Sequence, residues 1–325
     1  MQQNIGNKIR SYIKQGPLNI IVIGSTHERY EQQLCRTGHN FWCVEDHIKE
    51  WNISYGAIPE NYKIVMNVPI YVVPDLVLTH LSGERFNMGV QYANHFGVPL
   101  IRHTHTIRES ARELELSRSQ MPHVDTFISK YSMDMWAPKV ESFVVNHGLD
   151  TDLWMPEDVE SDGSIMSVVN FWASRDWACG WNFYNQIKNC LKDENFKVLC
   201  DNPGLSKPEK NLGALIYELN KSYIFLNTSL NSPIPMSLLE AMACGRPVVS
   251  TSTCMIPEYV KHEYNGLLGE TPDELASHIR RLREDRELAL YLGRNARKTM
   301  VENYNINKFI NKWDKIFNHA INTYK

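Results

Sequence analysis

The apolar residues of this chain fall into short runs separated by longer amphipathic stretches. Runs rich in Val, Ile and Leu are typical of parallel strands buried on both faces, and the stretches between them have helical spacing. A first series of expected strands comprises residues 18–23, 41–44, 76–78, 99–101, 127–129 and 142–145. A second series comprises residues 165–169, 197–200, 224–227 and 247–250.

This alternation predicts an α/β fold with two doubly wound, Rossmann-like domains that meet at a cleft, with ligands at the carboxyl ends of the strands. Residues 147–162 contain Gly, Pro and acidic residues and have the composition of a linker. We therefore predict a first domain over residues 1–148 and a second over residues 149–305. Apolar residues recur at helical spacing in residues 306–325, which predicts a final helix whose apolar stripe needs burial.

Composition narrows the classes of protein. The net charge of −3 provides no general basic footprint for nucleic acid, and no apolar run approaches the length of a membrane span. The N-terminal residues lack the apolar region of a secretion signal. Seven cysteines without a CxxC pair or zinc-ligand spacing favour reduced thiols. We expect a cytoplasmic protein, and composition leaves its oligomeric state open.

Residues 225–270 are the most informative stretch. FLN ends a predicted strand, a proline-rich elbow follows, and a helix runs to Cys244, where Gly245 ends it. A helix whose N-terminus points at such an elbow favours phosphate, because its first amides are unpaired and its dipole attracts anions. Glu240 lies inside this helix, where its carboxylate can reach a pair of ribose hydroxyls. The stretch therefore predicts half of a nucleotide-sugar site.

The segments LLEAMACGRPVVST, IPEYV and NGLLGE resemble the donor site of glycosyltransferase family four, a retaining family with the GT-B fold. VVNHGLDTDLWMP resembles the segment with which these enzymes enter their second domain, and the resemblance covers nearly the whole chain. It implies a nucleotide-diphosphate-sugar donor, UDP-linked by expectation, and retaining transfer. It also implies that the helix at residues 306–325 crosses back to the first domain.

The family's Glu-x7-Glu pair falls on Ser232 and Glu240 of this sequence. In relatives the second glutamate binds the nucleotide ribose, which the resemblance assigns to Glu240, and the first handles the donor sugar, a place taken here by Ser232. Pro235 replaces a glycine and has no amide, so the amides of Met236 and Ser237 are expected to hold phosphate. The alternative for Glu240 is a helical glutamate paired with a nearby base.

Relatives also hold the diphosphate with an arginine and a lysine in the loop after the second domain's first strand. Arg175 provides the arginine, whereas Cys179 stands at the lysine position. A guanidinium can grip a diphosphate and neutralise the leaving group, so Arg175 is a candidate catalytic residue. The alternative is an exposed arginine in an aromatic loop. Trp172, Trp177 and Trp181 either stack a sugar or base or pack in the core.

In the first domain, Gly24, Ser25 and Thr26 occupy a strand-to-helix turn that in relatives lies near the donor phosphate and the acceptor. His103 and His105 follow a predicted strand. The resemblance places on His105 the histidine that contacts the donor sugar, and the alternative is an ordinary polar loop residue.

Asp150-Thr151-Asp152 spells DxD, the metal–nucleotide motif of the other large glycosyltransferase fold. In this linker we interpret it as a turn, and we expect no metal or other cofactor, since arginine and helix N-termini can supply the positive charge.

The sequence leaves alternatives open for the acceptor of the sugar. The chain also resembles short glycosyltransferases of large tailed bacteriophages, some of which modify DNA. Hydroxymethylcytosine, or an already glycosylated base, is then one acceptor, with a cluster of arginines lining a groove: Arg102, Arg108, Arg112 and Arg118. Surface polysaccharide or a lipid-linked sugar is the alternative. Ser232 and Cys179 also leave open a non-catalytic nucleotide-sugar or carbohydrate-binding protein. A Rossmann-type dehydrogenase is excluded, because Gly24 opens no GxGxxG run.

Overall fold

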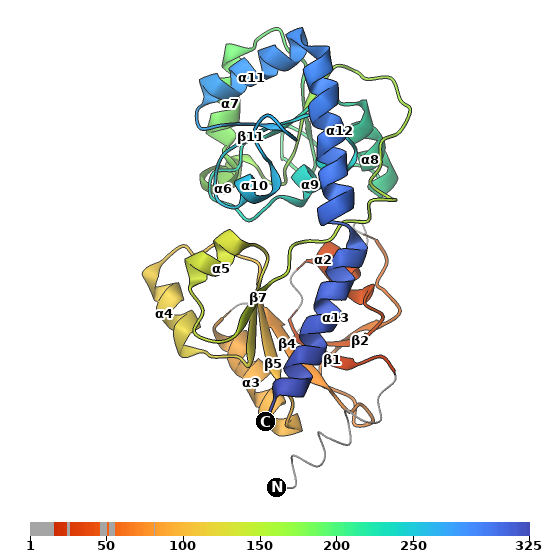
Figure 1. Cartoon of the computed structure of the whole chain (residues 1–325), viewed down its shortest axis with the longest axis vertical. Helices are drawn as coiled ribbons and strands as arrows, with labels where there is room; N and C mark the ends of the chain where they lie inside the picture. Colours follow the sequence, from red (N-terminus) through yellow and green to blue (C-terminus); the bar gives the residue numbers. More distant parts are fainter. Residues whose placement is uncertain (1–15, 25–26, 46–50, 52–55, 81) are drawn as a thin grey trace. The chain divides into compact units, whose positions relative to one another are not determined.

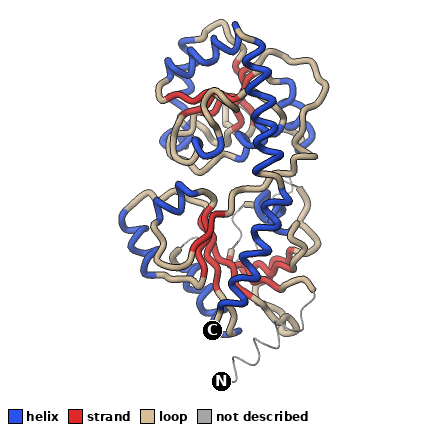
Figure 2. The backbone as a smooth tube through the Cα atoms, viewed as in Figure 1, coloured by secondary structure: helices blue, strands red, loops and turns tan. Residues whose placement is uncertain are grey.

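The computed structural model describes residues 16–24, 27–45, 51, 56–80 and 82–325. The chain divides into two compact units, each built on a parallel sheet (Figures 1 and 2). Unit 1 comprises Met1–Gly148 and Asn307–Lys325, and unit 2 comprises Leu149–Ile306.

Unit 1 contains a seven-stranded parallel sheet in the order β3-β2-β1-β4-β5-β6-β7. Its strands are β1 (Asn19–Ile23), β2 (Asn40–Val44), β3 (Tyr62–Val65), β4 (Leu76–His80), β5 (Leu100–Thr104), β6 (Val124–Phe127) and β7 (Ser142–Val144). The chain builds one side of the sheet from β1 to β3 and then returns to the other side of β1 with β4. The direction of winding therefore changes between β1 and β4, and their carboxyl ends flank this switch point.

Helices cover both faces of this sheet. They are α2 (Glu28–Cys35), α3 (Glu84–Phe96), α4 (Ala111–Ser119), α5 (Lys130–Trp136) and α13 (Ile306–Thr323). Ile21 and Val77 pack with Phe86 of α3 in one buried cluster. Tyr30 of α2 and Trp313 of α13 instead contact His103, whose side chain points to the opposite face from its β5 neighbour Leu100.

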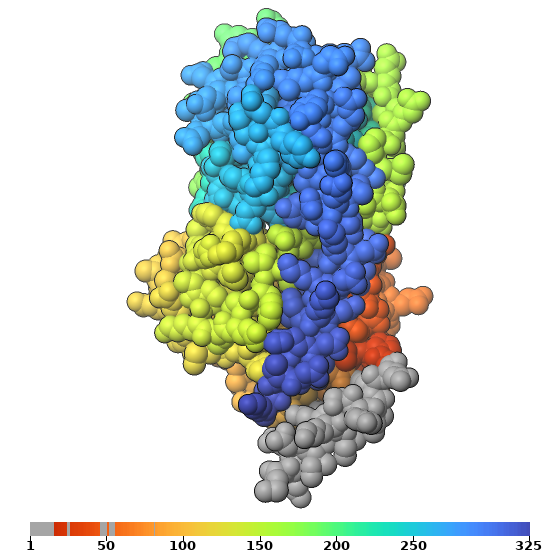
Figure 3. Space-filling model, in the orientation of Figure 1, coloured from red at the N-terminus to blue at the C-terminus, as the bar shows by residue number. Residues whose placement is uncertain are grey.

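The apolar stripe of α13 explains its place in unit 1. Phe309, Trp313 and Phe317 are buried, and Figure 3 shows α13, in dark blue, lying along the outside of unit 1. Burial of these rings removes a large apolar area from water.

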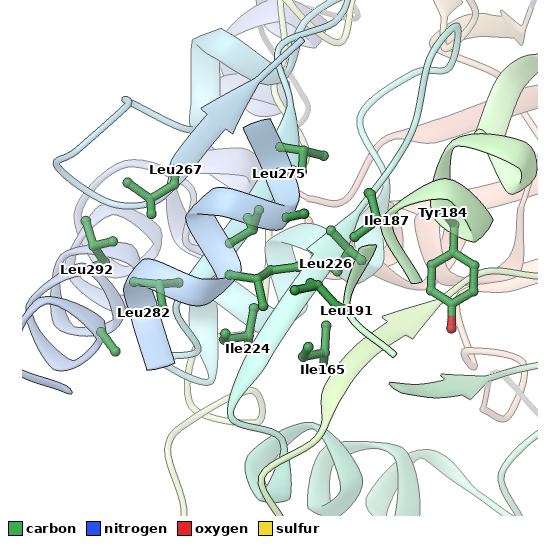
Figure 4. Packing of buried hydrophobic residues seen from close by; sticks show 14 of the residues in the cluster. Ile165, Tyr184, Ile187, Leu191, Ile224, Leu226, Leu267, Leu275, Leu282 and Leu292 are labelled. Atoms are coloured by element: carbon green, nitrogen blue, oxygen red, sulfur yellow. The ribbon is translucent and has the colours of Figure 1, made fainter. Parts of the chain in front are cut away.

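Unit 2 contains a five-stranded parallel sheet in the order β12-β11-β10-β8-β9. Its strands are β8 (Ile165–Val168), β9 (Phe196–Leu199), β10 (Ile224–Asn227), β11 (Val248–Thr251) and β12 (Leu267–Gly269). Its α-helices are α6 (Asp176–Cys179), α7 (Trp181–Cys190), α8 (Leu212–Lys221), α9 (Met236–Ala243), α10 (Ile256–Tyr259), α11 (Pro272–Glu284) and α12 (Arg286–Asn303). Figure 4 shows Ile224 and Leu226 of β10 packed among leucines and isoleucines of α7 and α11.

Two expected strands differ from their predicted bounds by three residues at one end. β5 continues to Thr104, so Arg102 and His103 are buried strand residues and do not lie in a loop. The strand expected at residues 127–129 begins at Val124 and ends at Phe127. Both corrections have one cause, because Arg102 and Asp125 are register partners in β5 and β6 and form a buried ion pair that lets polar residues continue the strands.

Replacement of Trp313 by alanine tests the place of α13. The side chain is fully buried, so Trp313→Ala should lower the free energy of unfolding of unit 1 by about 3–5 kcal/mol. Trp177→Ala is the matched control, since 57% of Trp177 is exposed, and its loss should stay within about 0.5 kcal/mol. Urea unfolding followed by circular dichroism measures both. Equal small losses would show that α13 is not part of the core of unit 1.

Candidate functional site

The candidate donor site of unit 2 lies where the winding of its sheet reverses. The chain runs from β8 to β9 on one side, then returns to place β10 on the other side of β8. In open parallel sheets, ligands bind outside the carboxyl ends of the strands at such a switch point. The loops that follow β8 and β10 carry Arg175 and Ser232 respectively, so the topology brings these two candidate segments to the same edge of the sheet.

These two loops are held together by backbone contacts. The amides of Leu230 and Asn231 donate to the carbonyl of Ala178 at 2.9 and 3.1 Å. The Thr228 hydroxyl lies 2.9 Å from the carbonyl oxygen of Cys179. Gly180 has φ +70°, and a Cβ there would lie 2.1 Å from the carbonyl oxygen of Thr228, so glycine is required at this junction.

Cys179 contributes packing to this junction and no positive charge. Its side chain is buried, and burial raises the pKa of its thiol, so the group stays neutral. Its carbonyl also accepts a hydrogen bond from Nε1 of Trp172 at 2.8 Å. Trp172 is 1% exposed and belongs to the hydrophobic core. Of the two alternatives for this residue, it therefore packs in the core and does not stack on a sugar or base.

The N-terminus of α9 faces the same edge of the sheet. Pro235 occupies the N-cap position, and no side chain caps the helix. The Ser237 hydroxyl donates to the carbonyl of Val168 at 2.9 Å, which holds the first turn of α9 against the end of β8. The first amides of the helix, those of Met236 and Ser237, therefore lie at the switch point, where they can donate hydrogen bonds to an anion.

The other donor-side candidates differ in exposure. Glu240 is in the middle of α9 and is 1% exposed, whereas Ser232 is half-buried in the preceding loop. Arg175 ends a 3₁₀ turn, Ala173–Arg175, and is exposed, with Nη1 3.5 Å from the carbonyl oxygen of Asn170. Its guanidinium is thus accessible to a ligand at the end of β8.

In unit 1, Gly24 ends β1 at the other switch point. It has φ +70°, its amide donates to the carbonyl of Val44 at 3.2 Å, and a Cβ there would lie 2.5 Å from Nη1 of Arg85. A cation of α3, which the sequence analysis missed, therefore lies over this turn. Ser25 and Thr26 lie outside the described residues.

Four histidines surround Tyr30 in unit 1. The ring of Tyr30 lies 4.4 to 6.2 Å, centroid to centroid, from those of His80, His103, His105 and His147. His105 Nε2 is 3.0 Å from His80 Nδ1, and His103 Nδ1 is 2.8 Å from the Thr126 hydroxyl. His103 is fully buried, whereas His105 keeps part of its surface exposed.

Burial lowers the pKa of all four imidazoles. The pKa falls to about 3 for His80 and about 4 for His147. The pKa values of His103 and His105 also fall well below 6.5, first through desolvation and then through the neighbouring histidines. The cluster is therefore neutral near pH 7, and its members can act as hydrogen-bond donors and acceptors in defined tautomers.

His80 and Glu31 were not among the residues predicted from the sequence. Both are fully buried, and Oε1 of Glu31 lies 3.7 Å from Nε2 of His80. The available signal was the position of His80, which closes the apolar run of β4 beside the switch point.

The four arginines proposed to line a nucleic-acid groove differ in burial and do not form one exposed surface. Arg102 is buried, and its Nε and Nη2 donate to the carboxylate of Asp125 at 2.7 Å each, so it cannot line a groove. Arg112 and Arg118 lie on α4, and Arg108 precedes it. Arg112 is exposed, whereas Arg108 and Arg118 are half-buried.

A cavity of about 280 Å³ lies beside α4, and its lining includes carboxylates but none of these arginines. The lining residues are Ser82, Thr104, Thr106, Ile107, Glu109, Glu113, Leu116 and Trp136. Hydroxyls, carboxylates and one indole ring suit a polar, uncharged ligand better than a phosphate chain.

Asp150 forms a turn, as predicted for the DxD segment, since its Oδ1 accepts from the amides of Asp152 and Leu153. Among the residues with a described position, no three His, Cys, Asp or Glu side chains are arranged to hold a metal ion. Within the same part of the chain, no helix is both long enough and apolar enough to cross a membrane.

Comparison with known proteins adds to this geometry. Residues 205–299, which include α9 and β11, match the family model of glycosyl transferases group 1. An uncharacterized glycosyltransferase of Methanocaldococcus jannaschii is 35% identical over 99 residues, covering 30% of this chain and 24% of the relative. A Campylobacter jejuni N,N'-diacetylbacillosaminyl-diphospho-undecaprenol alpha-1,3-N-acetylgalactosaminyltransferase is 29% identical over 161 residues, covering 45% of this chain and 43% of the relative. These matches span less than half of either curated relative.

The fold resembles that of solved glycosyltransferases over almost the whole chain. The structure of Anabaena HepE in complex with UDP has a TM-score of 0.75 at 14% identity, covering 93% of this chain and all of that one (100%). Sucrose-phosphate synthase from Thermosynechococcus elongatus gives 0.74 at 13% identity, covering 93% of this chain and 98% of that one. The predicted fold class, two parallel α/β domains of the GT-B type, is confirmed.

The buried histidines predict a loss of stability in acid. An unfolded histidine titrates near 6.5, whereas His80 and His147 titrate near 3 and 4 in the folded chain. Between these values the unfolded chain binds more protons, so the free energy of unfolding falls as the pH falls below about 6.5. Each buried histidine contributes a slope of up to about 1.4 kcal/mol per pH unit.

Unfolding of unit 1 measured between pH 7.5 and 5 checks this slope. His147→Asn should flatten the slope, and the same change at His95, which is exposed on α3, should leave it as it is. A stability that does not vary over this range would contradict a neutral buried cluster.

Proposed function

We propose that the chain is a glycosyltransferase that moves a sugar from a UDP-sugar to a hydroxyl acceptor. The observation that carries the proposal is the switch point of unit 2, where the loop bearing Arg175 meets the uncapped N-terminus of α9. This geometry suits a diphosphate, and α9 lies within the segment that matches glycosyl transferases group 1. The UDP and UDP-glucose complexes of HepE support uridine as the nucleotide.

The proposed roles follow from position and chemistry. The amides of Met236 and Ser237 and the guanidinium of Arg175 bind the diphosphate. Glu240, buried about one helical turn beyond the amides of Met236 and Ser237, binds the ribose hydroxyls. On unit 2, Ser232 is the residue proposed to contact the donor sugar. On unit 1, His105 is proposed to hydrogen-bond a sugar hydroxyl, and Gly24 allows close approach of the backbone.

Positive charge at the diphosphate is what the reaction needs most. The bond between the anomeric carbon and the β-phosphate oxygen breaks, UDP leaves with its charge increased, and the acceptor oxygen bonds to the same carbon while its proton is released. Arg175 and the α9 amides stabilise the charge that develops on the leaving group. Retention of configuration is proposed from the resemblance to family four.

For the acceptor we propose a saccharide hydroxyl, on a polysaccharide or a lipid-linked sugar. The cavity with Glu109 and Glu113 supports it, because carboxylates accept hydrogen bonds from sugar hydroxyls and repel phosphate. The name of the Campylobacter relative also includes a lipid-linked sugar. Hydroxymethylcytosine in phage DNA is the competing acceptor, and the exposure of Arg112 is the observation in its favour.

Glu240→Gln tests the donor site. The substitution keeps the shape of the side chain and removes its charge, so UDP affinity should fall about 10- to 100-fold. Calorimetry with 2′,3′-dideoxy-UDP is the decisive comparison, since this ligand lacks the hydroxyls and should bind both proteins equally. Glu302→Gln, on the exposed side of α12, is the control and should bind UDP as the unmodified protein does. A tenfold loss for both ligands would mean that Glu240 supports the fold of the site without contacting ribose.

The dependence of transfer on salt separates the two acceptors. If Arg108, Arg112 and Arg118 each neutralise a DNA phosphate, transfer to hydroxymethylated DNA at subsaturating acceptor should fall about 40-fold between about 50 and 200 mM salt. Transfer to an uncharged oligosaccharide should change less than about twofold over the same range. We expect the second behaviour. Efficient, strongly salt-dependent transfer to DNA would replace the saccharide acceptor, and UDP binding without release of UDP from any UDP-sugar would identify a non-catalytic binder.

A further inference from the structure

We propose that Glu31 and His80 are positioning residues that fix the tautomer of His105, so that His105 keeps its proton on Nε2 and offers Nδ1 as a hydrogen-bond acceptor to a sugar hydroxyl. The inference rests on the proposed function for the identity of the ligand. The tautomer itself follows from contacts within unit 1.

The first step is the charge next to His80. Glu31 is fully buried, and its carboxylate Oε1 is 3.7 Å from Nε2 of His80. Burial, followed by the negative charge of Glu31, raises the pKa of the Cys35 thiol, so this neighbour is neutral. A carboxylate at this distance is too far for a normal hydrogen bond, but it favours the tautomer of His80 whose N–H faces it.

The second step transmits this choice to His105. With its proton on Nε2, His80 presents an unprotonated Nδ1, and that atom lies 3.0 Å from Nε2 of His105. One of the two nitrogens must donate, so His105 carries its proton on Nε2. Its other ring nitrogen, Nδ1, is then a lone-pair acceptor. His105, which follows β5, keeps part of its surface exposed, whereas His103 within β5 is fully buried, so a ligand can approach His105.

His103 provides an internal contrast. The Thr126 hydroxyl donates to the carbonyl of Arg102 at 3.1 Å, so its oxygen can only accept from His103 Nδ1 at 2.8 Å. His103 therefore carries its proton on Nδ1. The structure thus assigns opposite tautomers to two histidines that are two residues apart, and only the tautomer of His105 depends on Glu31.

The contacts described for His105 are with aromatic and histidine rings. Its ring packs against Tyr30, His80, His103 and His147, and the charge of His27 also acts on it. Burial raises the pKa of Tyr30, so the phenol keeps its proton. Among the described groups, Glu31 contacts this set through His80, whose ring also hydrogen-bonds to the backbone of His103.

Nitrogen-15 NMR of the histidine side chains tests the inference on the full chain without any ligand. We expect His105 with its proton on Nε2 and His103 with its proton on Nδ1. In Glu31→Gln, the neutral amide can donate as well as accept, so the tautomer of His105 should become mixed or reverse while that of His103 stays unchanged. The unchanged signal of His103 also reports that the variant is folded. Finding His105 protonated on Nδ1 in the unmodified protein would overturn the proposal before any variant is made.

Kinetics supply the second readout. Glu31→Gln should lower kcat with UDP-sugar about 10- to 100-fold, as is typical when an orienting partner is lost, while UDP affinity changes less than about twofold because the proposed nucleotide contacts lie on unit 2. Glu45 is another buried carboxylate of unit 1, and it contacts the thiol of Cys43, so Glu45→Gln is the control and should change neither quantity. Failure to bind UDP at all would refute the proposed function and leave the tautomer assignment standing. An unaltered kcat and unaltered tautomers in Glu31→Gln would refute the positioning role alone.

Discussion

The candidate donor site depends on the close approach of two loops at the switch point of unit 2. Gly180 brings the end of α6 so near Thr228 that no side chain fits between them. Backbone hydrogen bonds from Leu230 and Asn231 to Ala178 then lock the loop after β10 onto the loop after β8. Arg175 lies in one loop, and α9 begins after the other. This junction therefore sets the positions of the guanidinium and of the helix N-terminus that would bind a diphosphate.

Unit 1 differs from unit 2 in that it buries a cluster of polar aromatic rings. Four histidines, Tyr30 and Trp313 lie between α2, the sheet and α13. Desolvation keeps the imidazoles neutral, and hydrogen bonds in such surroundings are strong because little water competes. A neutral, preorganised histidine suits recognition of sugar hydroxyls, which need a defined donor or acceptor and no charge. The same burial makes unit 1 sensitive to acid, so recognition and stability are linked through the same side chains.

The extent to which the sequence predicts this structure follows from the range of the interactions. Apolar runs such as that of β10 and the stripe of α13 report local burial, and their positions agree with the predicted elements. The glycine that ends α9, Gly245, is likewise a signal that lies next to the helix in the sequence. β5 was predicted too short, because the pairing of Arg102 with Asp125 hides polar residues inside the sheet and joins positions 23 residues apart. His80 and Glu31 were missed for the same reason, since nothing in the sequence near either residue indicates the other.

The motif residues show a similar division. Met236 and Ser237 lie at the start of α9 and Glu240 lies inside it, as the elbow and helix pattern indicated. Cys179 was noted only as a substitution at the lysine position, whereas the structure makes it a buried part of the loop junction. Its role depends on Thr228 and Trp172, which belong to other segments, so local sequence could not provide it.

A crystal structure of the protein with UDP tests the central claim most directly. We expect the diphosphate at the N-terminus of α9, within reach of the Arg175 guanidinium, and the ribose hydroxyls at the carboxylate of Glu240. UDP bound elsewhere, or a ribose that does not contact Glu240 while the diphosphate avoids α9, would contradict the assignment of this switch point as the donor site.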